Sequence, residues 1–278
     1  MQIYSIGVRQ VQQAQSNSTK SANKLSSGDR LHKLGTDSAG LSVSSRQTSD
    51  ARSLQMASRN IQDGLTLTDT IASALTSMKD LLVRGRELAV QASNGTYDDT
   101  QRAQMNVEFN NLLTEFDTQA ARTEWNGIQV LNSTNNDFKL QIGRDNTSSS
   151  QLSIDLSSFL SAINSISTTN GTTLEGTQTN GIATQSTAQQ AMIDMDDALN
   201  NIYEKLAQAG GIQKRLEHTL ENNYTNTNSS KASASRISDA DYAIETAEMT
   251  KNQILLQSGT AAMNKVKEIA SASLSLLS

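Results

Sequence analysis

Apolar and small residues recur at every third and fourth position from Leu54 to Ala92, and this spacing is the strongest signal in the chain. It is the spacing of one helix face, sustained over roughly five heptads, so it predicts a single long helix. A face so rich in small residues is marginal alone, and we expect partner helices to stabilise it, with neighbouring backbones close together. The face comprises Leu54, Ala57, Ile61, Gly64, Thr68, Ile71, Leu75, Met78, Leu82, Gly85, Ala89 and Ala92.

Two more long helices are predicted in the middle of the chain. Asn94 and Gly95 readily take the left-handed conformation that ends helices, and Asp98 or Asp99 can cap the helix that follows. Asn126 and Gly127 are expected to end that second helix. The apolar positions are Met105, Phe109, Leu112 and Phe116 in the second helix, and Met192, Met195, Leu199, Ile202, Leu206, Ala209, Leu216 and Leu220 in the third.

Between the second and third helices the apolar period changes to two, at Ile128 and Val130, then across 138–142 and again across 152–156. This alternation, separated by Asn-, Asp- and Gly-rich turns, predicts a β-hairpin patch of two or three strands. So small a patch is unstable alone and should pack on the helices. Residues 164–187 are rich in Ser, Thr, Asn and Gly and are expected to form a short surface connection.

Both ends of the chain show weak helical patterns, over residues 1–40 and 236–278. A bend is expected near residues 32–40, where Asp37 or Ser38 can cap the next helix. These ends hold too little apolar surface to offset their ordering entropy in a monomer, so we expect them to pair with each other and with other copies. Contacts between unlike surfaces that do not close into a ring produce a helical filament.

The composition supports long helices rather than a large globular core. Proline and cysteine are absent and aromatic residues make up 4 % of the chain. The net charge of −5 has no basic block, which argues against nucleic acid or an anionic membrane as a partner. No apolar run is long enough to span a bilayer, and the first residues lack a secretory signal, so the chain is either cytosolic or exported without one.

Residues that could carry catalysis or bind a cofactor are sparse. His32 and His218 lie far apart in polar surroundings, and no HExxH pair is present. Gly210 and Gly211 lack the spacing of a phosphate-binding loop and are expected to be a soft point in the third helix. The aspartates at 194, 196 and 197 lack calcium-loop spacing. We therefore expect no enzyme activity, no cofactor and no metal.

Seven segments, in order, resemble one family. The chain is similar over nearly its whole length to bacterial flagellin, the subunit of the flagellar filament. The matching segments are KLSSGDRL (24–31), TDSAGLSVS (36–44), ASRNIQDGLTLTDT (57–70), RELAVQASNGT (86–96), WNGIQVLN (125–132), RISDADYAIETAEMTKNQILLQSGTAAM (236–263) and LSLLS (274–278).

The resemblance implies a mainly α fold: long antiparallel helices forming a coiled-coil rod with a small β-hairpin patch, plus paired terminal helices. It implies an inner terminal domain from residues 1–40 and 236–278, and a rod domain from 41–163 and 188–235. The interval from about 157 to 186 leaves room only for a short connection, so a minimal flagellin without a large outer domain is expected. Ile254, Leu255, Leu274 and Leu277 are expected to pack in the filament core.

The family also implies partners. The subunit is expected to polymerise with itself, to leave the cell through the flagellar export apparatus without a cleaved signal peptide, and to bind an export chaperone through its carboxy-terminal segment. Hook-associated and cap proteins are further expected partners. A host Toll-like receptor recognises some flagellins through residues that match Arg84, Leu88 and Glu108. The alternative for these three is filament contact or solvation for the charged pair and packing for Leu88.

Two alternative functions remain open at this point. The flagellin-like junction protein between hook and filament shares the terminal patterns but matches RELAVQASNG and WNGIQVLN less faithfully. A soluble coiled-coil scaffold would instead form a discrete oligomer with stable ends.

Overall fold

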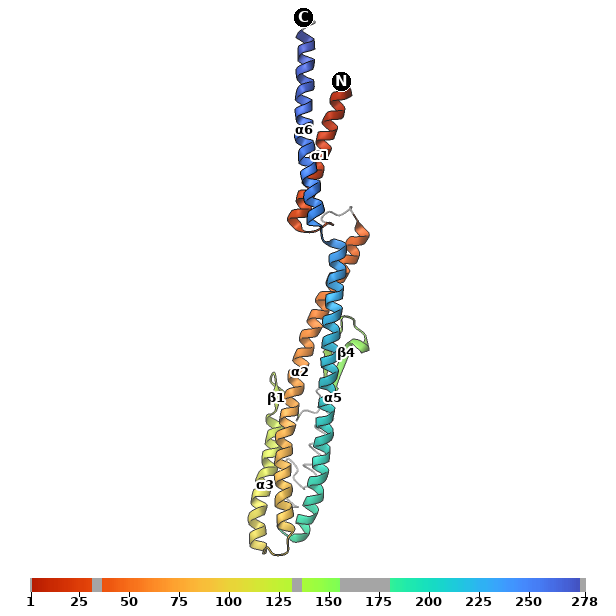
Figure 1. The fold of residues 1–278 in the computed structure, drawn as a ribbon. Helices are drawn as coiled ribbons and strands as arrows, with labels where there is room; N and C mark the ends of the chain where they lie inside the picture. The colour runs from red at the N-terminus through yellow and green to blue at the C-terminus, as the bar shows by residue number, and fades with distance from the viewer. Residues whose placement is uncertain (1, 32–36, 132–136, 156–180, 276–278) are drawn as a thin grey trace. The chain divides into compact units, whose positions relative to one another are not determined.

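The computed structural model describes residues 2–31, 37–131, 137–155 and 181–275 of the 278-residue chain (Figure 1). They form two compact units: residues 1–52 with 227–278, called the terminal unit, and residues 53–226, called the central unit. The predicted mainly α fold with paired terminal helices is confirmed. The helices are α1 (Gln2–Ser27), α2 (Ser38–Ser93), α3 (Asp99–Arg122), α5 (Gln185–Ser238) and α6 (Tyr242–Ser275).

The long helix predicted from the apolar spacing is α2, and all twelve residues of its predicted face are buried. The helix also extends further toward the amino terminus than that face. Asp37 caps this end, because its Oδ1 accepts a hydrogen bond from the Gly40 amide at 2.8 Å. The prediction of a cap at Asp37 or Ser38 is therefore confirmed.

The core of the central unit lies between α2, α3 and α5, which run side by side (Figure 1). Phe109 and Phe116 of α3 are fully buried there, against Met78 of α2 and Met195 of α5. Small residues of α2 make room for these neighbours. At Gly64 an added Cβ would lie 2.5 Å from Leu140 Cδ1, so side chains rather than a neighbouring backbone fill the space.

The end of α2 and the start of α3 have well-formed caps. Asp98 Oδ1 accepts a hydrogen bond from the Gln101 amide at 2.8 Å, and the Asp98 amide donates one to Gln101 Oε1 at 3.1 Å, which completes a capping box. The buried Arg102 guanidinium donates to the carbonyls of Ala92 at 2.9 Å and Asn94 at 3.0 Å. These bonds satisfy carbonyl groups that the end of α2 leaves without helical partners.

The β residues form two separate two-stranded antiparallel sheets rather than one patch: β1 (Glu124–Trp125) with β2 (Ile128–Gln129), and β3 (Asp137–Gln141) with β4 (Gln151–Asp155). The prediction that Asn126 and Gly127 end the second helix is wrong. That helix ends at Arg122, and both residues have positive φ, 52° and 76°, as a tight hairpin turn between β1 and β2 requires.

The β3–β4 sheet packs on the helices of the central unit, as predicted. Leu152 and Ile154 of β4 are buried, and Ile142 and Leu152 cluster with Ile61 of α2 and Leu216 of α5. Asn60 Nδ2 donates to the carbonyl of Gln141 at 3.0 Å, and Asn223 Nδ2 donates to that of Ile142 at 2.8 Å. The predicted strand position Leu156 lies outside the described residues.

Helix α5 runs without interruption through Gly210 and Gly211, where an added Cβ would meet nothing within 4 Å. The expected soft point is therefore ordinary helix. The part of the predicted surface connection at 164–180 lies outside the described residues. None of the described helices is long and apolar enough to cross a membrane.

Candidate assembly surfaces

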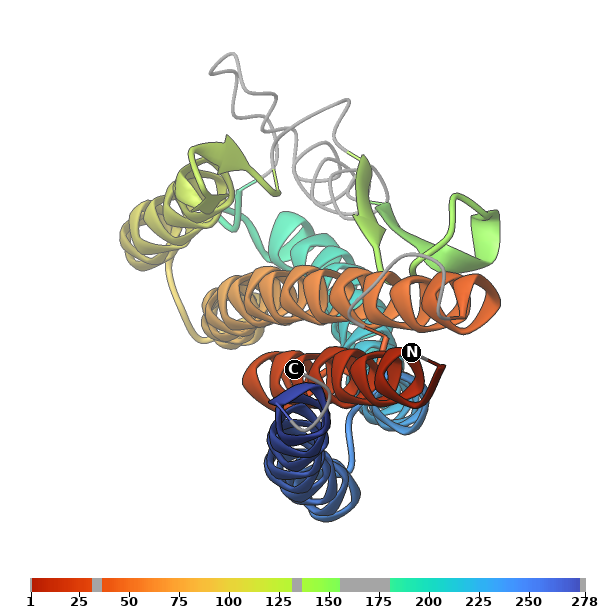
Figure 2. The ribbon, with the colours of Figure 1, turned by 90° about the horizontal axis from the view of Figure 1, so that it is seen from above.

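In the terminal unit, α1 and α6 pack side by side and antiparallel (Figures 1 and 2). Contacts show the direction: Gly7 lies against Met263, Val11 against Gly259, and Lys24 against Glu245. As residue numbers rise along α1, those of the partners on α6 fall.

One narrow stripe of α6 faces α1. Among the side chains of α6 that the structure describes, the buried and half-buried ones recur at alternating intervals of four and three residues, which is one helix face. They are Glu245, Met249, Asn252, Leu256, Gly259 and Met263. All other described side chains of α6 are exposed to solvent.

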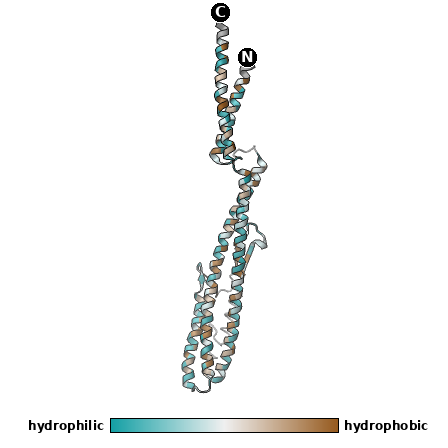
Figure 3. Cartoon of the chain, viewed as in Figure 1, coloured by the Kyte–Doolittle hydropathy of each residue, from teal (hydrophilic) through white to brown (hydrophobic). Residues whose placement is uncertain are grey.

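Several large apolar side chains of α6 lie outside this stripe. Figure 3 colours the chain by hydropathy, and hydrophobic residues recur along α6. Ile254 is 60 % exposed and Leu255 is 49 % exposed. At 100° per residue, Ile254 points away from α1 while Leu255 lies beside the α1-facing stripe. Ile244, Val266 and Ile269 are exposed as well. A helix with apolar residues on more than one side is normally buried on more than one side, so α1 alone does not satisfy α6.

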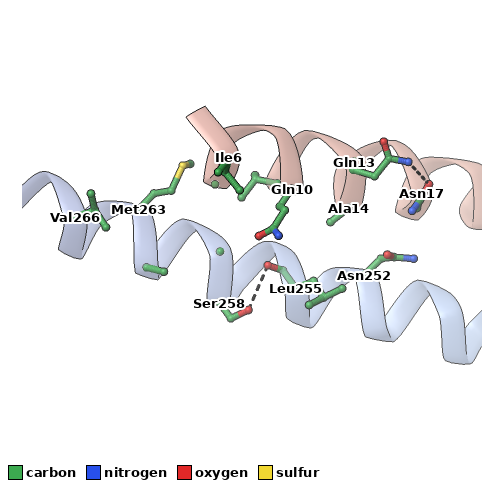
Figure 4. Close-up of a pocket in the computed structure, with 14 residues that line it drawn as sticks. Ile6, Gln10, Gln13, Ala14, Asn17, Asn252, Leu255, Ser258, Met263 and Val266 are labelled. Atoms are coloured by element: carbon green, nitrogen blue, oxygen red, sulfur yellow. Dashed lines mark hydrogen bonds between the residues drawn. The ribbon is translucent and has the colours of Figure 1, made fainter. Parts of the chain in front are cut away.

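A groove of about 540 Å³ runs between α1 and α6 (Figure 4). Its apolar lining includes Ile6 from α1 and Leu255, Met263 and Val266 from α6. Polar side chains share the groove, among them Gln10, Gln13, Asn17, Asn252 and Ser258. Among the residues expected in the filament core, Leu255 therefore lines the groove and Ile254 lies outside it. The Leu274 side chain and Leu277 lie outside the described residues.

A second candidate surface lies on the central unit, where Arg84 of α2 and Glu108 of α3 form an exposed ion pair. Arg84 Nη2 and Nε donate to Glu108 Oε1 at 2.7 and 3.1 Å, and Nη1 donates to Glu87 Oε2 at 3.1 Å. These bonds, to Glu108 first and Glu87 second, raise the pKa of Arg84 above its ordinary value. Leu88 is 2 % exposed and belongs to the core.

Sequence reasoning missed some residues of these surfaces. Val83 and Val90 of α2 are exposed. The seven-residue interval between them, away from the buried face, was the signal in the sequence that could have identified them. Arg86 binds Asp196 of α5 through two hydrogen bonds of 2.5 and 3.2 Å, and this contact lowers the pKa of Asp196. The Lys24–Glu245 contact joins residues too distant in the sequence for any local pattern to reveal.

Residues considered for catalysis or metal binding are not brought together. Asp194 is buried and accepts a hydrogen bond from Gln190 at 2.9 Å, whereas His218 is exposed. His32 lies outside the described residues. Within the described ranges, no three His, Asp or Glu side chains gather as a metal ion would require.

Paired terminal helices with unsatisfied apolar surface, in a chain that also contains a bundle of long helices, define a helical protein suited to association with further copies. Two family models match the chain: the bacterial flagellin N-terminal helical region over residues 2–136, and the bacterial flagellin C-terminal helical region over residues 192–277. The chain therefore belongs to the bacterial flagellin family and is a structural subunit of the flagellar filament.

Individual relatives agree with the family models. The chain is 35 % identical over 254 residues to a flagellin of Listeria innocua, covering 90 % of this chain and 88 % of that protein. It is 33 % identical over 276 residues to a flagellin of Bacillus subtilis, covering 90 % of each. A crystal structure of Bacillus cereus flagellin matches with a TM-score of 0.50 and 29 % identity, over 59 % of this chain and 88 % of that one. Neither the junction protein nor the soluble scaffold finds support among these matches.

Proposed function

We propose that the subunit enters the filament through its terminal unit, with each α1–α6 pair packing against the pairs of neighbouring copies. The observation that supports this most is the exposure of Ile254 and Leu255 on different sides of α6. In this proposal residues 1–40 and 236–278 form the inner terminal domain, and residues 41–163 and 188–235 form the rod domain. Leu274 and Leu277 are proposed to pack in the filament core as well.

The physical basis is the burial of apolar surface that the single subunit leaves in water. Each exposed Ile or Leu gains roughly 1.5–3 kcal/mol when fully buried, and several such residues lie along α6. Because these side chains lie on more than one side of the helix, one partner copy cannot cover them all. Repeated contacts between unlike surfaces then extend the assembly without closing it.

The double substitution Ile254→Gln with Leu255→Gln tests the proposal. It removes apolar surface from two sides of α6 without touching the core of the central unit, so polymerisation should be lost while the fold remains. Purified protein is mixed with short filament seeds and ammonium sulfate, and growth is followed by electron microscopy. Far-ultraviolet circular dichroism and the melting temperature report whether the helices stay folded.

Gln253→Ala with Gln257→Ala is the matched control, because both glutamines are exposed on the same turns of α6. The control variant should elongate like the natural chain. Normal filaments from the Ile254 and Leu255 variant would overturn the proposed role of α6. Discrete particles from the natural chain would favour a soluble scaffold, and seeds that are capped but do not grow would favour the junction protein.

We further propose the partners that accompany this role. An export chaperone covers the carboxy-terminal segment before assembly, since the exposed apolar side chains of α6 would otherwise associate prematurely in the cytosol. The subunit leaves through the flagellar export apparatus without a cleaved signal peptide, and hook-associated and cap proteins contact it at the ends of the filament.

A host Toll-like receptor is a proposed partner of the surface around Arg84 and Glu108. Both side chains are exposed and can form charged contacts, whereas Leu88 supports the surface from within the core. Arg84→Ala should then weaken receptor binding in a surface plasmon resonance measurement with the soluble subunit. An unchanged affinity would leave the ion pair with only a structural or filament role.

A further inference from the structure

The side-chain packing between α1 and α6 does little to fix the register, that is, the position of one helix along the axis of the other. The most buried side chains in this pair are Ala14, Ser21, Glu245 and Asn252, which are small or polar. Glycines occupy the contact on both helices, at Gly7 and Gly259. Large apolar side chains that are fully buried normally fix the register of a helix pair. In this seam Met249, Leu256 and Met263 are only half-buried, and the small residues make similar contacts after a shift of one turn.

One ion pair in this seam does depend on register. Lys24 Nζ lies 2.6 Å from Glu245 Oε1, and the two side chains are 30 % and 11 % exposed. The bond to Lys24, assisted by one from Ser21, lowers the pKa of Glu245 although burial opposes this. A shift of α6 by one turn moves Glu245 by about 5.4 Å along the helix axis. Such a shift breaks the contact and leaves a largely buried carboxylate without its cation.

A set of backbone hydrogen bonds lies directly beside this ion pair. The Arg30 amide donates to the Ser238 carbonyl at 2.6 Å, and the Ala240 amide donates to the Gly28 carbonyl at 2.8 Å. Arg30 Nη2 also donates to the Ile237 carbonyl at 2.7 Å. These bonds place Asp29 opposite Asp239 in antiparallel pairing. They tie the chain just after α1 to the chain just before α6.

The close pairing depends on the local conformation at both connections. Gly28 has a φ of +74°, which ends α1 and turns the chain toward residues 237–240. Asp241 then starts α6, since its Oδ1 accepts hydrogen bonds from the amides of Ala243 and Ile244. Both helices are therefore held at the same end, with Lys24 and Glu245 about one turn away.

We propose that the Lys24–Glu245 ion pair and the paired connections at 28–30 and 237–240 act together as a register lock for the α1–α6 pair. The proposal rests on the proposed function, because the register decides which side chains of α6 border the groove and face neighbouring copies. Buried polar contacts are best known for selecting one register among several of similar energy. The lock thus makes the assembly surface unique, while the apolar side chains supply the association energy.

Charge reversal tests the lock. The variants are Lys24→Glu alone, Glu245→Lys alone, and both together, which restores the ion pair in the opposite sense.

The register is measured by disulfide formation between introduced cysteine pairs. Since the chain has no cysteine of its own, any disulfide that forms joins the introduced residues. Val11→Cys with Gly259→Cys reports the observed register, where an added Cβ at Gly259 lies 2.7 Å from Val11 Cγ2. Val11→Cys with Met263→Cys reports a shift of one turn. The ratio of the two disulfide yields is measured in soluble subunits and in seeded filaments.

Each single reversal should lower the ratio of in-register to shifted disulfide about tenfold, and the double reversal should restore most of it. Seeded elongation should fall in the single variants and recover in the double variant.

The matched control reverses the exposed pair of Lys265 and Glu268 on the same helix, which should leave the disulfide ratio unchanged. Unchanged ratios in both single variants, or no recovery in the double variant, would overturn the lock. Failure of the natural chain to elongate would instead count against the proposed filament contact, and the disulfide ratio in soluble subunits would still decide the lock.

Discussion

Glycine is unfavourable inside a helix, yet three glycines lie within long helices of this chain: Gly64 in α2, and Gly210 and Gly211 in α5. Their surroundings differ. At Gly64 the side chains of Leu140 and Leu216 occupy the space that a larger residue would need. At Gly210 and Gly211 that space is open. The sequence shows the same residue type in a helical pattern at each position, so only the neighbours in space distinguish a packing requirement from a simple cost in backbone entropy.

Substitutions at these glycines should therefore have opposite effects on the free energy of unfolding. Gly211→Ala should stabilise the protein by about 0.5–1 kcal/mol, because alanine restricts the unfolded chain and meets no neighbour in α5. Gly64→Leu should destabilise it by about 1–3 kcal/mol through overpacking against Leu140. Urea denaturation followed by circular dichroism measures both changes. Equal effects of the two substitutions would contradict the packing at Gly64.

At the scale of elements, the helix pair α1–α6 and the central bundle use different interactions. The central bundle buries Phe, Met, Leu and Ile between three helices. The α1–α6 pair buries a charged group, Glu245, and depends on Lys24 to compensate it. An interface of this kind responds to pH, because protonation of the Glu245 carboxylate removes the charge to which Lys24 binds.

Acid should weaken the α1–α6 pair through Glu245. Its pKa is lowered in the folded pair by the bond to Lys24, so the contribution to stability is complete above the ordinary glutamate pKa of about 4.3 and is lost as pH falls through the folded value. Filament disassembly, followed by light scattering between about pH 5 and pH 2, should have a weaker pH dependence in Glu245→Gln than in the natural chain. Identical acid profiles would show that other carboxylates govern disassembly.

At the scale of the whole molecule, stability is unevenly distributed between the two units. The central unit contains both clusters of buried apolar residues, whereas the terminal unit exposes large apolar side chains on α6. Segments with few buried apolar contacts open most readily. The free subunit should therefore have labile ends that become protected when neighbouring copies cover them.

Limited proteolysis should show this difference. A low concentration of trypsin should remove roughly the first 40 and last 45 residues of the soluble subunit and leave a resistant central fragment. In filaments the same sites should be protected. Mass spectrometry of the fragments locates the cleavage points, and full protection of both ends in the soluble subunit would contradict the proposed coupling of folding to assembly.

Much of the fold was predictable because its signals are local. The face from Leu54 to Ala92, the caps at Asp37 and Asp98, and the change to strand periodicity each depend on residues within a few positions of one another. The turn at Asn126 and Gly127 was misread because the same two residue types can end a helix or join two strands. Pairing of Trp125 with Ile128 decides between these outcomes.

The sequence by itself determined the helices, their apolar faces and, through its ordered segments, the family to which the chain belongs, because helical periodicity and short motifs are properties of neighbouring residues. The tertiary structure alone showed that Leu88 is in the core, that Leu140 fills the space at Gly64, and that Lys24 meets Glu245. These contacts join residues far apart in the chain. They depend on how the helices align with one another, which no local pattern specifies.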